Sequence, residues 1–286
     1  MKGIILAAGK GTRLYPASMP VSKNLLPIYD KPMIYYPLAT LMNAGIRDIL
    51  IVVSKSERAY YKKLLKDGKQ FGISIKYAVQ KEQKGITDAF LTAERFISND
   101  SVALVLGDNI FCGEGMYELL AQAMGEFVGA CVFCKKEDNP ADTVTAEVDP
   151  EGKITALGSR SASALSVAGL YFFDGEACRY AKKLAERKNG FGMEDLLKAY
   201  LDKGELKAQV LESDAIWASS NSFDSLHQAS DYIYNLEKNS RTVVSCPEEV
   251  ALRMGYITKK QLADWVTESP DNSYFDYVRS LVKEDS

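Results

Sequence analysis

The chain has 286 residues, 47% of them hydrophobic, which suffices for one large core or two modest ones. Its 35 basic and 38 acidic residues give a formal charge of -3, and this near-neutrality argues against nucleic acid as a main partner, because nucleic-acid binding usually demands a basic face. No apolar run approaches the ~18 residues of a membrane span, and the N-terminus lacks a signal-peptide pattern, so we expect a soluble cytoplasmic protein with no membrane partner.

The chain opens with an apolar run of strand type, Lys2–Ala7, that leads into a glycine-containing loop. Gly9 and Gly11 let the backbone approach phosphate oxygens closely, and Arg13 adds a planar cation that can bind two oxygens at once. Lys23 is near enough in sequence to reach the same pocket. A strand, a loop with free backbone N–H groups and nearby basic side chains are together typical of a polyphosphate site.

This loop matches neither of the common nucleotide-binding motifs. A Walker loop has a lysine directly after its last glycine, whereas Gly11 is followed by Thr12 and Arg13. The third glycine of the dinucleotide fingerprint would fall at Leu14. On these residues alone, a plain turn between a strand and a helix is as good an interpretation as a phosphate site.

Strands and helices alternate through residue 134. Strand-like runs lie at 2–7, 48–53, 73–79, 102–106 and 130–134, and helical patterns at 30–45, 56–67, 85–97 and 116–124. This alternation predicts an α/β fold with a doubly wound, mostly parallel sheet. Because ligands bind at the carboxyl ends of such strands, the loops at 8–13, 80–85 and 107–109 should converge on one rim.

The cysteines and the single histidine indicate packing rather than a metal site. Five scattered cysteines suit a reducing compartment. Cys131 and Cys134 have the spacing of a metal-binding pair, but in a strand-like run residues three apart point to opposite faces. His227 lies in a helical pattern with no second histidine or cysteine nearby, so a metal or triad role is not expected.

After residue 140 the order of elements changes. We expect a hairpin at 143–148 and 153–157, strands at 167–173 and 206–211, and helices at 176–187, 193–201, 223–238 and 259–267. We predict one α/β domain over 1–240 and a C-terminal helical extension over 241–286 packed on it. The aromatic residues of the extension fit either packing on the domain or a subunit interface or allosteric pocket: Tyr256, Trp265, Tyr274, Phe275 and Tyr277.

Several stretches resemble the sugar-nucleotide pyrophosphorylase family: LAAGKGTRLYP at 6–16, SKNLLPIYDKPMIYYPL at 22–38, AGIRDILI at 44–51 and LVLGDNIF at 104–111. Within that family, AGLYFFD at 168–174 and VSCPEEVALRMGYI at 244–257 resemble the bacterial glucose-1-phosphate thymidylyltransferases. The resemblance runs nearly end to end and implies a Rossmann-like nucleotide-diphospho-sugar transferase fold. It also implies that an acceptor phosphate oxygen attacks the α-phosphorus of a nucleoside triphosphate in line, with release of pyrophosphate.

The resemblance further implies roles for individual residues of the nucleotide side. The nucleotide would be bound by residues of the first loop and of a later strand end, namely Leu6, Ala8, Gly9, Gly11, Thr12, Arg13, Gln80 and Gly85. Arg13 and Lys23 would be catalytic, because they would stabilise charge on the reacting phosphorus and the departing pyrophosphate. Asp108 would bind Mg²⁺. Thymine is the favoured base, with uracil and cytosine as competitors.

The second half departs from the family pattern in its acceptor-side motifs. Thr143 stands where the family has tyrosine, and Gly192 stands where it has a sugar-binding glutamate. Arg160 is the surviving cation of an otherwise altered motif, and Ser219 replaces the second metal-binding aspartate. Because Mg²⁺ can be bound by one or two carboxylates together with phosphates, Asp108 alone could suffice at weaker affinity.

These departures leave three hypotheses, of which we put the first ahead. It is an active nucleotidyltransferase whose phosphorylated acceptor is not glucose 1-phosphate, because buried hydroxyl-binding groups carry much of the discrimination in such sites. The second is an ordinary glucose-1-phosphate thymidylyltransferase whose sugar contacts have moved to other residues. The third is a nucleotide-binding homologue without turnover. In each case the resemblance implies a homo-oligomer, either a tetramer or a dimer.

Overall fold

The first strand of the chain lies in the middle of the main sheet. The structure is a computed structural model that describes residues 1–81, 88–113, 115–137, 143–186, 192–212 and 215–283. Four neighbouring strands run parallel in the order β6 (Val102–Leu106), β1 (Lys2–Ala7), β4 (Asp48–Val53) and β5 (Ser74–Val79). Their carboxyl ends therefore share one edge of the sheet, as the sequence predicted.

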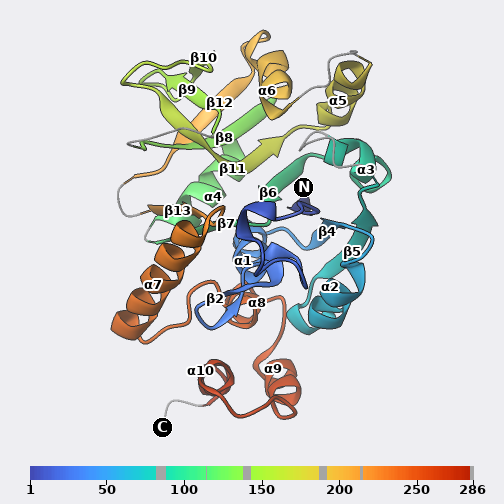
Figure 1. Ribbon diagram of the computed structural model, residues 1–286, viewed down its shortest axis with the longest axis vertical. Coiled ribbons are helices and arrows are strands. Elements are labelled where there is room, and N and C mark those ends of the chain that lie inside the picture. Colours follow the sequence, from blue (N-terminus) through green and yellow to red (C-terminus); the bar gives the residue numbers. More distant parts are fainter. Residues whose placement is uncertain (82–87, 114, 138–142, 187–191, 213–214, 284–286) are drawn as a thin grey trace.

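A long strand, β11 (Leu165–Phe173), joins this parallel region to a mixed one. It runs antiparallel to β6 and to two further strands, β8 (Ala130–Lys135) and β9 (Thr145–Val148). The hairpin expected after residue 140 is confirmed, since β9 pairs with β10 (Ile154–Leu157), and β12 (Leu206–Val210) runs parallel to β8. The fold is thus α/β with a central, mostly parallel sheet, as Figure 1 shows.

Alternate residues of the central strands belong to two separate hydrophobic clusters, one on each face of the sheet. In β4, Ile51 belongs to the first cluster and Val52 to the second. The first cluster includes side chains of α1 (Tyr35–Asn43), α2 (Arg58–Leu65) and α4 (Met116–Glu126). The second includes side chains of α3 (Asp88–Ile97), α5 (Ala177–Ala185) and α6 (Met193–Leu201). Both faces of the sheet are therefore covered by helices, which is the doubly wound arrangement that the sequence predicted.

The cysteines pack as the sequence indicated. Cys131 belongs to the first cluster and Cys134 to the second, so the two side chains lie on opposite faces of β8. His227 is exposed and lies 3.4 Å from the carboxylate of Asp231, one turn further along its helix. Among the residues that the structure describes, no group of three or more histidine, cysteine and carboxylate side chains is placed to hold a metal ion.

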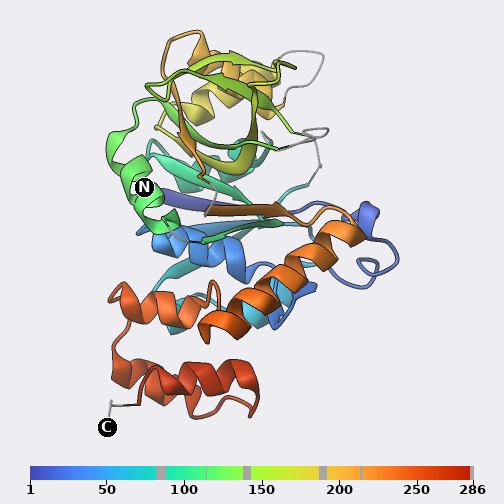
Figure 2. The same ribbon diagram turned by 90° about the vertical axis from the view of Figure 1, so that its left-hand side faces the viewer.

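The C-terminal part is helical and packs against the α/β part. It follows α7 (Phe223–Ser240) and consists of α8 (Pro247–Arg253), α9 (Lys259–Val266) and α10 (Ser273–Ser280). Figure 2 shows α9 and α10 at the end of the molecule away from β9 and β10. Tyr274 and Val278 belong to the first core cluster, and Trp265 packs on Phe275 with ring centroids 5.8 Å apart. All five aromatic residues of the extension thus pack in or against the first cluster, and Tyr274 and Tyr277 also line a cavity of about 390 Å³. The subunit interface and the domain division at residue 240 stay predictions.

Some elements differ from those that the sequence predicted. The helix expected over 30–45 begins only at Tyr35, because β2 (Pro27–Ile28) and β3 (Lys31–Pro32) form a small hairpin before it. Two strands were not predicted, β7 (Asn109–Gly113) and β13 (Ala215–Ser219), and they pair antiparallel in a sheet of their own. Helices α8 and α10 were not predicted either. Within the described ranges, no helix is both long enough and apolar enough to cross a membrane.

Candidate active site

The loop after β1 brings Gly11 against Lys23. Gly11 has φ 62°, in the left-handed region that favours glycine, and a short helical turn at Thr12–Leu14 follows it. A Cβ atom at Gly11 would lie 3.0 Å from Cβ of Lys23 and 3.3 Å from Oγ of Ser18. Ser18 Oγ also donates a 2.6 Å hydrogen bond to the Gly11 carbonyl oxygen. The glycine therefore permits both the turn and the close approach of Lys23.

A cavity of about 200 Å³ opens beside this loop. Its lining consists of residues from the loop, from the segment after it and from a distant part of the chain: Gly11, Thr12, Arg13, Leu14, Lys23 and Asn221. Arg13 and Lys23, the two residues predicted to be catalytic, thus both line one cavity. Two cations next to a glycine-containing loop form a site suited to phosphate oxygens.

Asp108 lies at the turn between β6 and β7 and pairs with Lys23. Lys23 Nζ donates to Oδ2 of Asp108, while Oδ1 accepts a 2.8 Å hydrogen bond from Nδ2 of Asn109. The side chains are only 15% exposed at Lys23 and 11% exposed at Asp108, so the pair is shielded from water. The neighbouring Gly107 N–H donates a 2.8 Å bond to the Leu6 carbonyl, which holds the ends of β1 and β6 together.

Asn221 was not predicted as a site residue, yet it contacts Lys23. Its Oδ1 accepts a 3.0 Å hydrogen bond from Lys23 Nζ, and its Nδ2 donates to Oγ of Ser219. Ser219, which the sequence placed with the acceptor-side residues, therefore lies with Lys23 and Asp108. The sequence signal that pointed here was the altered motif at 217–221, although only Ser219 was selected from it.

The donor groups at this place fit Mg²⁺ only in part. Both carboxylate oxygens of Asp108 already accept hydrogen bonds, one from Lys23 and one from Asn109. Among the described residues, Ser219 and Asn221 add uncharged oxygens to this group of contacts. Since Mg²⁺ commonly keeps waters and takes phosphate oxygens as ligands, one carboxylate can hold it when a triphosphate is also present.

The remaining nucleotide-side residues lie along the same strand ends. Ala8 is buried, and Gly9 has open space where a side chain would stand. Gln80 follows β5, two strands away from β1, and its Nε2 donates a 2.9 Å bond to Oδ2 of Asp88. Gly85, predicted to lie near the base, falls outside the described residues.

The other three acceptor-side residues closely precede or follow β9, β10 and α6, elements that Figure 1 shows in its upper part. Thr143 Oγ1 lies 3.1 Å from Oγ of Ser166, and Arg160 is exposed in the loop after β10. Gly192 precedes α6 and donates its N–H to Asp195 over 2.8 Å. A Cβ at Gly158 would lie 3.1 Å from Oε1 of Glu194, so the Arg160 loop and the start of α6 are neighbours.

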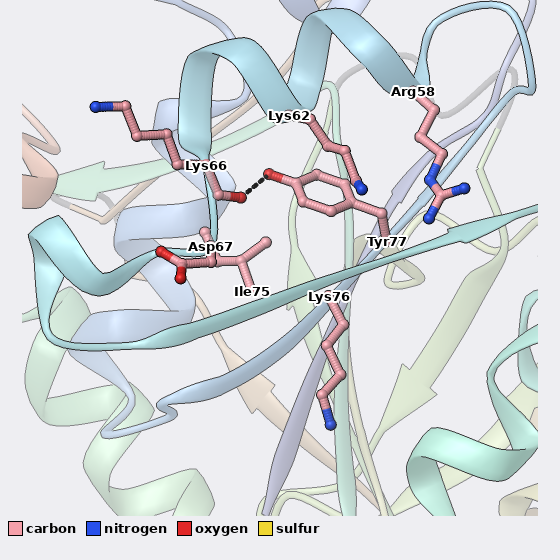
Figure 3. Close-up of a pocket in the computed structure, with 7 residues that line it drawn as sticks. All are labelled: Arg58, Lys62, Lys66, Asp67, Ile75, Lys76 and Tyr77. Carbon is pink, nitrogen blue, oxygen red and sulfur yellow. Dashed lines mark hydrogen bonds between the residues drawn. The ribbon is translucent and has the colours of Figure 1, made fainter.

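A larger cavity of about 490 Å³ lies elsewhere, between α2 and the edge strand β5, and Figure 3 shows its lining. It is basic, with Arg58, Lys62, Lys66 and Lys76 around Tyr77. In Figure 3, however, Lys66 and Lys76 extend away from one another, and Tyr77 Oη is already bonded to the Lys66 carbonyl over 2.8 Å. Only Arg58 and Lys62 point toward the same side of the Tyr77 ring, so the four cations do not all face one point.

The sequence matches the nucleotidyl transferase family over residues 2–235. The chain belongs to this family. A glucose-1-phosphate thymidylyltransferase of Neisseria meningitidis is 42% identical over 99% of this chain and 100% of its own, and one of Xanthomonas campestris is 42% identical over 99% and 97%. A solved structure from Bacillus anthracis, described as a candidate glucose-1-phosphate thymidylyltransferase, has 31% identity and a TM-score of 0.73 over 81% of this chain and 94% of its own. The protein is thus a nucleotidyltransferase of the sugar-nucleotide pyrophosphorylase family, an enzyme of the EC 2.7.7 type.

Proposed function

We propose that this nucleotidyltransferase couples a pyrimidine nucleoside triphosphate, dTTP first among them, to a phosphorylated acceptor other than glucose 1-phosphate. The part of the proposal that concerns the nucleoside triphosphate is supported by one observation: Arg13 and Lys23 line the same cavity beside the Gly11 loop. The pairing of Lys23 with Asp108 supports it further, because a cation and a carboxylate that could hold a metal ion then lie together beside this cavity.

In this proposal, residues of the first loop hold the triphosphate while the acceptor approaches from the side of β9, β10 and α6. An acceptor phosphate oxygen forms a bond to the α-phosphorus, and the bond from that phosphorus to the bridging oxygen of pyrophosphate breaks. The attacking oxygen is already anionic near neutral pH, so the protein supplies positioning and positive charge rather than a strong base. Arg13 and Lys23 stabilise the charge that builds up on the phosphorus centre and on the leaving pyrophosphate.

Mg²⁺ is part of the proposal as a cofactor. Asp108 would hold the ion together with triphosphate oxygens, and the ion would neutralise phosphate charge when bound. Ser219 and Asn221 offer neutral oxygens in place of a second carboxylate. We therefore expect a weak metal site in the absence of nucleotide.

The proposal of a different acceptor rests on several residues that depart from the family pattern on the acceptor side. By resemblance, Thr143 replaces a tyrosine and Gly192 replaces a sugar-binding glutamate, so the acceptor side offers fewer groups that would recognise sugar hydroxyls. Ser219 replaces a metal-binding aspartate in the same half of the chain. Arg160 is exposed beside the start of α6 and supplies a cation for an acceptor phosphate or phosphonate. These features favour a different acceptor over glucose 1-phosphate.

Glucose 1-phosphate is the second candidate acceptor, and a specific observation favours it. The relatives from Neisseria meningitidis and Xanthomonas campestris, each 42% identical over nearly the whole chain, are both glucose-1-phosphate thymidylyltransferases. Glu194, which lies beside Gly158, is a carboxylate that could contact a sugar hydroxyl in this case.

A release assay tests the proposal. The protein is incubated with Mg²⁺, each of dTTP, UTP and CTP, and a panel of sugar phosphates, polyol phosphates and phosphonates, while pyrophosphate is measured. We expect release with dTTP and at least one acceptor that is not glucose 1-phosphate. Release with glucose 1-phosphate alone would select the second candidate, and absence of release throughout would contradict both.

A further inference from the structure

The amide of Asn221 lies at the phosphate cavity and contacts the catalytic candidate Lys23. It accepts a 3.0 Å hydrogen bond from Nζ of a lysine that is 198 positions earlier in the chain. We infer that Asn221 is a positioning residue for Lys23, and that it holds the ammonium group between Asp108 and the phosphate cavity. This inference rests on the proposed function, in which Lys23 stabilises phosphate charge.

The backbone around Asn221 is tied to the turn that carries Asp108. Ser219 ends β13 and pairs with Asn109, the first residue of β7. The N–H of Ser220 donates a 3.1 Å hydrogen bond to the carbonyl oxygen of Asp108. The two side chains that contact Lys23 therefore lie just outside two paired strands of one small sheet, Asp108 directly before β7 and Asn221 two residues after β13, and backbone hydrogen bonds hold these segments together.

The orientation of the Asn221 amide follows from its two partners. A lysine ammonium group can only donate, so the amide oxygen must face Lys23. The amide nitrogen then faces Oγ of Ser219, a hydroxyl oxygen that can accept its hydrogen bond. Lys23 thus fixes which way the amide points, and the hydroxyl of Ser219, which replaces the expected metal-binding aspartate, accepts the hydrogen bond from the amide nitrogen.

A neutral acceptor suits this position better than a carboxylate. Lys23 Nζ uses one N–H for Asp108 and one for Asn221, which leaves a third for a phosphate oxygen in the cavity. A second carboxylate here would neutralise the ammonium further and would repel the phosphates. The amide oxygen holds the ammonium by a hydrogen bond without adding a negative charge, so the positive charge remains effective toward the substrates.

Kinetics of Asn221→Ala test the inference, with Asn235→Ala as the matched control on the exposed face of α7. We expect kcat to fall about tenfold to a hundredfold, because small displacements of a positioned group have effects of that size. The KM for the nucleoside triphosphate should change less than about twofold, and the melting temperature should match that of the control. An unchanged kcat, or a raised KM at unchanged kcat, would overturn the inference.

A binding measurement tests the same placement without turnover. Asn221→Asp puts a carboxylate where the amide oxygen now faces Lys23 and Asp108, so Mn²⁺ should bind the protein at least about tenfold more tightly than it binds the wild type. The titration is followed by the electron paramagnetic resonance of free Mn²⁺, with Asn235→Asp as the control. Equal affinities of both variants would overturn the placement.

These two measurements separate the inference from the proposed function. A wild-type protein that releases no pyrophosphate with any substrate pair would refute the proposed function alone, and the Mn²⁺ titration would then decide the placement of Asn221. An active wild type with an equally active Asn221→Ala variant would refute the inference alone.

Discussion

The two sides of the proposed active site differ in whether their predicted site residues contact one another directly. On the nucleotide side, Lys23, Asp108 and Asn221 are joined by direct contacts beside the Gly11 loop. On the acceptor side, Thr143 contacts Ser166, while Arg160 is exposed in a loop. A substitution at Lys23, Asp108 or Asn221 therefore removes a contact that another of the three residues makes. A substitution at Thr143 or Arg160 leaves the contacts of these three residues unchanged.

Replacing Lys23 should give the largest effect. Lys23→Ala removes the cation from the cavity and should lower kcat by about 10²–10³-fold, the size seen when one charge-stabilising donor is lost. The fold should remain intact, because Asp108 keeps its bond from Asn109. Pyrophosphate release and circular dichroism check both expectations, with Lys62→Ala in exposed α2 as the control. Undiminished release would refute the role given to Lys23.

Filling the space at Gly11 should affect stability and the site together. Gly11→Ala forces a left-handed conformation on alanine, which should lower the free energy of unfolding by about 1–2 kcal/mol. Its Cβ would also press on Lys23, so triphosphate binding should weaken. Urea unfolding and calorimetric titration with dTTP measure the two effects.

The matched control for that change is Gly125→Ala in α4, where a Cβ would meet nothing within 4 Å. This variant should gain up to about 1 kcal/mol of stability, because alanine favours a helix more than glycine does. If Gly11→Ala proved as stable as Gly125→Ala, the cost assigned to the left-handed backbone at Gly11 would be refuted, and unchanged dTTP binding would contradict the predicted effect on Lys23.

A substitution on the acceptor side should have a smaller effect, and it should change the KM for the acceptor but not the KM for the nucleoside triphosphate. Arg160→Ala should raise the KM for the acceptor about fivefold, since an exposed ion pair contributes up to about 1 kcal/mol. The KM for the nucleoside triphosphate should stay within about twofold. Steady-state kinetics with each substrate varied in turn measure this, with exposed Arg179→Ala on α5 as the control. Equal changes for both substrates would contradict the separation of the two sides.

The smallest expected effect is a pH dependence of the free energy of unfolding that arises at Glu248, away from the proposed active site. Glu248 is 1% exposed and accepts a 2.6 Å hydrogen bond from Oη of Tyr274. Burial raises the pKa of the Glu248 carboxyl above its ordinary value of 4.5. The folded protein therefore binds this proton more tightly than the unfolded chain does, so the stabilisation is complete below about pH 4.5 and is lost as the pH rises through the folded pKa.

In the Glu248→Gln variant the side chain is uncharged at every pH, so the variant should not lose stability as the pH rises. The melting temperature of the variant, relative to wild type, should rise as the pH increases above about 4.5. Thermal melts across a pH series measure the difference, and the exposed Glu151→Gln serves as the control. A difference that stays constant with pH would contradict the effect of burial.

The local parts of the fold and of the site could be predicted from the sequence. Apolar runs predicted strands β4 and β6 with the bounds that the structure shows. The glycine loop, Arg13 and Lys23 all lie within the first 25 residues. Asp108 lies two residues after the apolar strand β6, and its predicted role came from the family resemblance of the stretch 104–111. Each of these features depends on neighbours in the chain.

The other features depend on distant contacts. Strands β7 and β13 are short, and they become recognisable only by pairing with each other across more than a hundred residues. Asn221 gains its proposed role from a lysine 198 positions away, so the altered motif at 217–221 marks its neighbourhood but not its contact. The helix α10 follows a polar segment, and its buried Tyr274 is explained by a core formed by other elements.

The separation between a preserved nucleotide side and an altered acceptor side is tested most directly by a comparison of two acceptors. Pyrophosphate release from dTTP and Mg²⁺ is measured with glucose 1-phosphate as the sole acceptor and, separately, with the best other phosphorylated compound of the panel. We predict that kcat/KM for the other acceptor is at least about tenfold higher, equivalent to about 1.4 kcal/mol of transition-state binding. A kcat/KM for glucose 1-phosphate equal to or above that of every other acceptor would contradict the proposal.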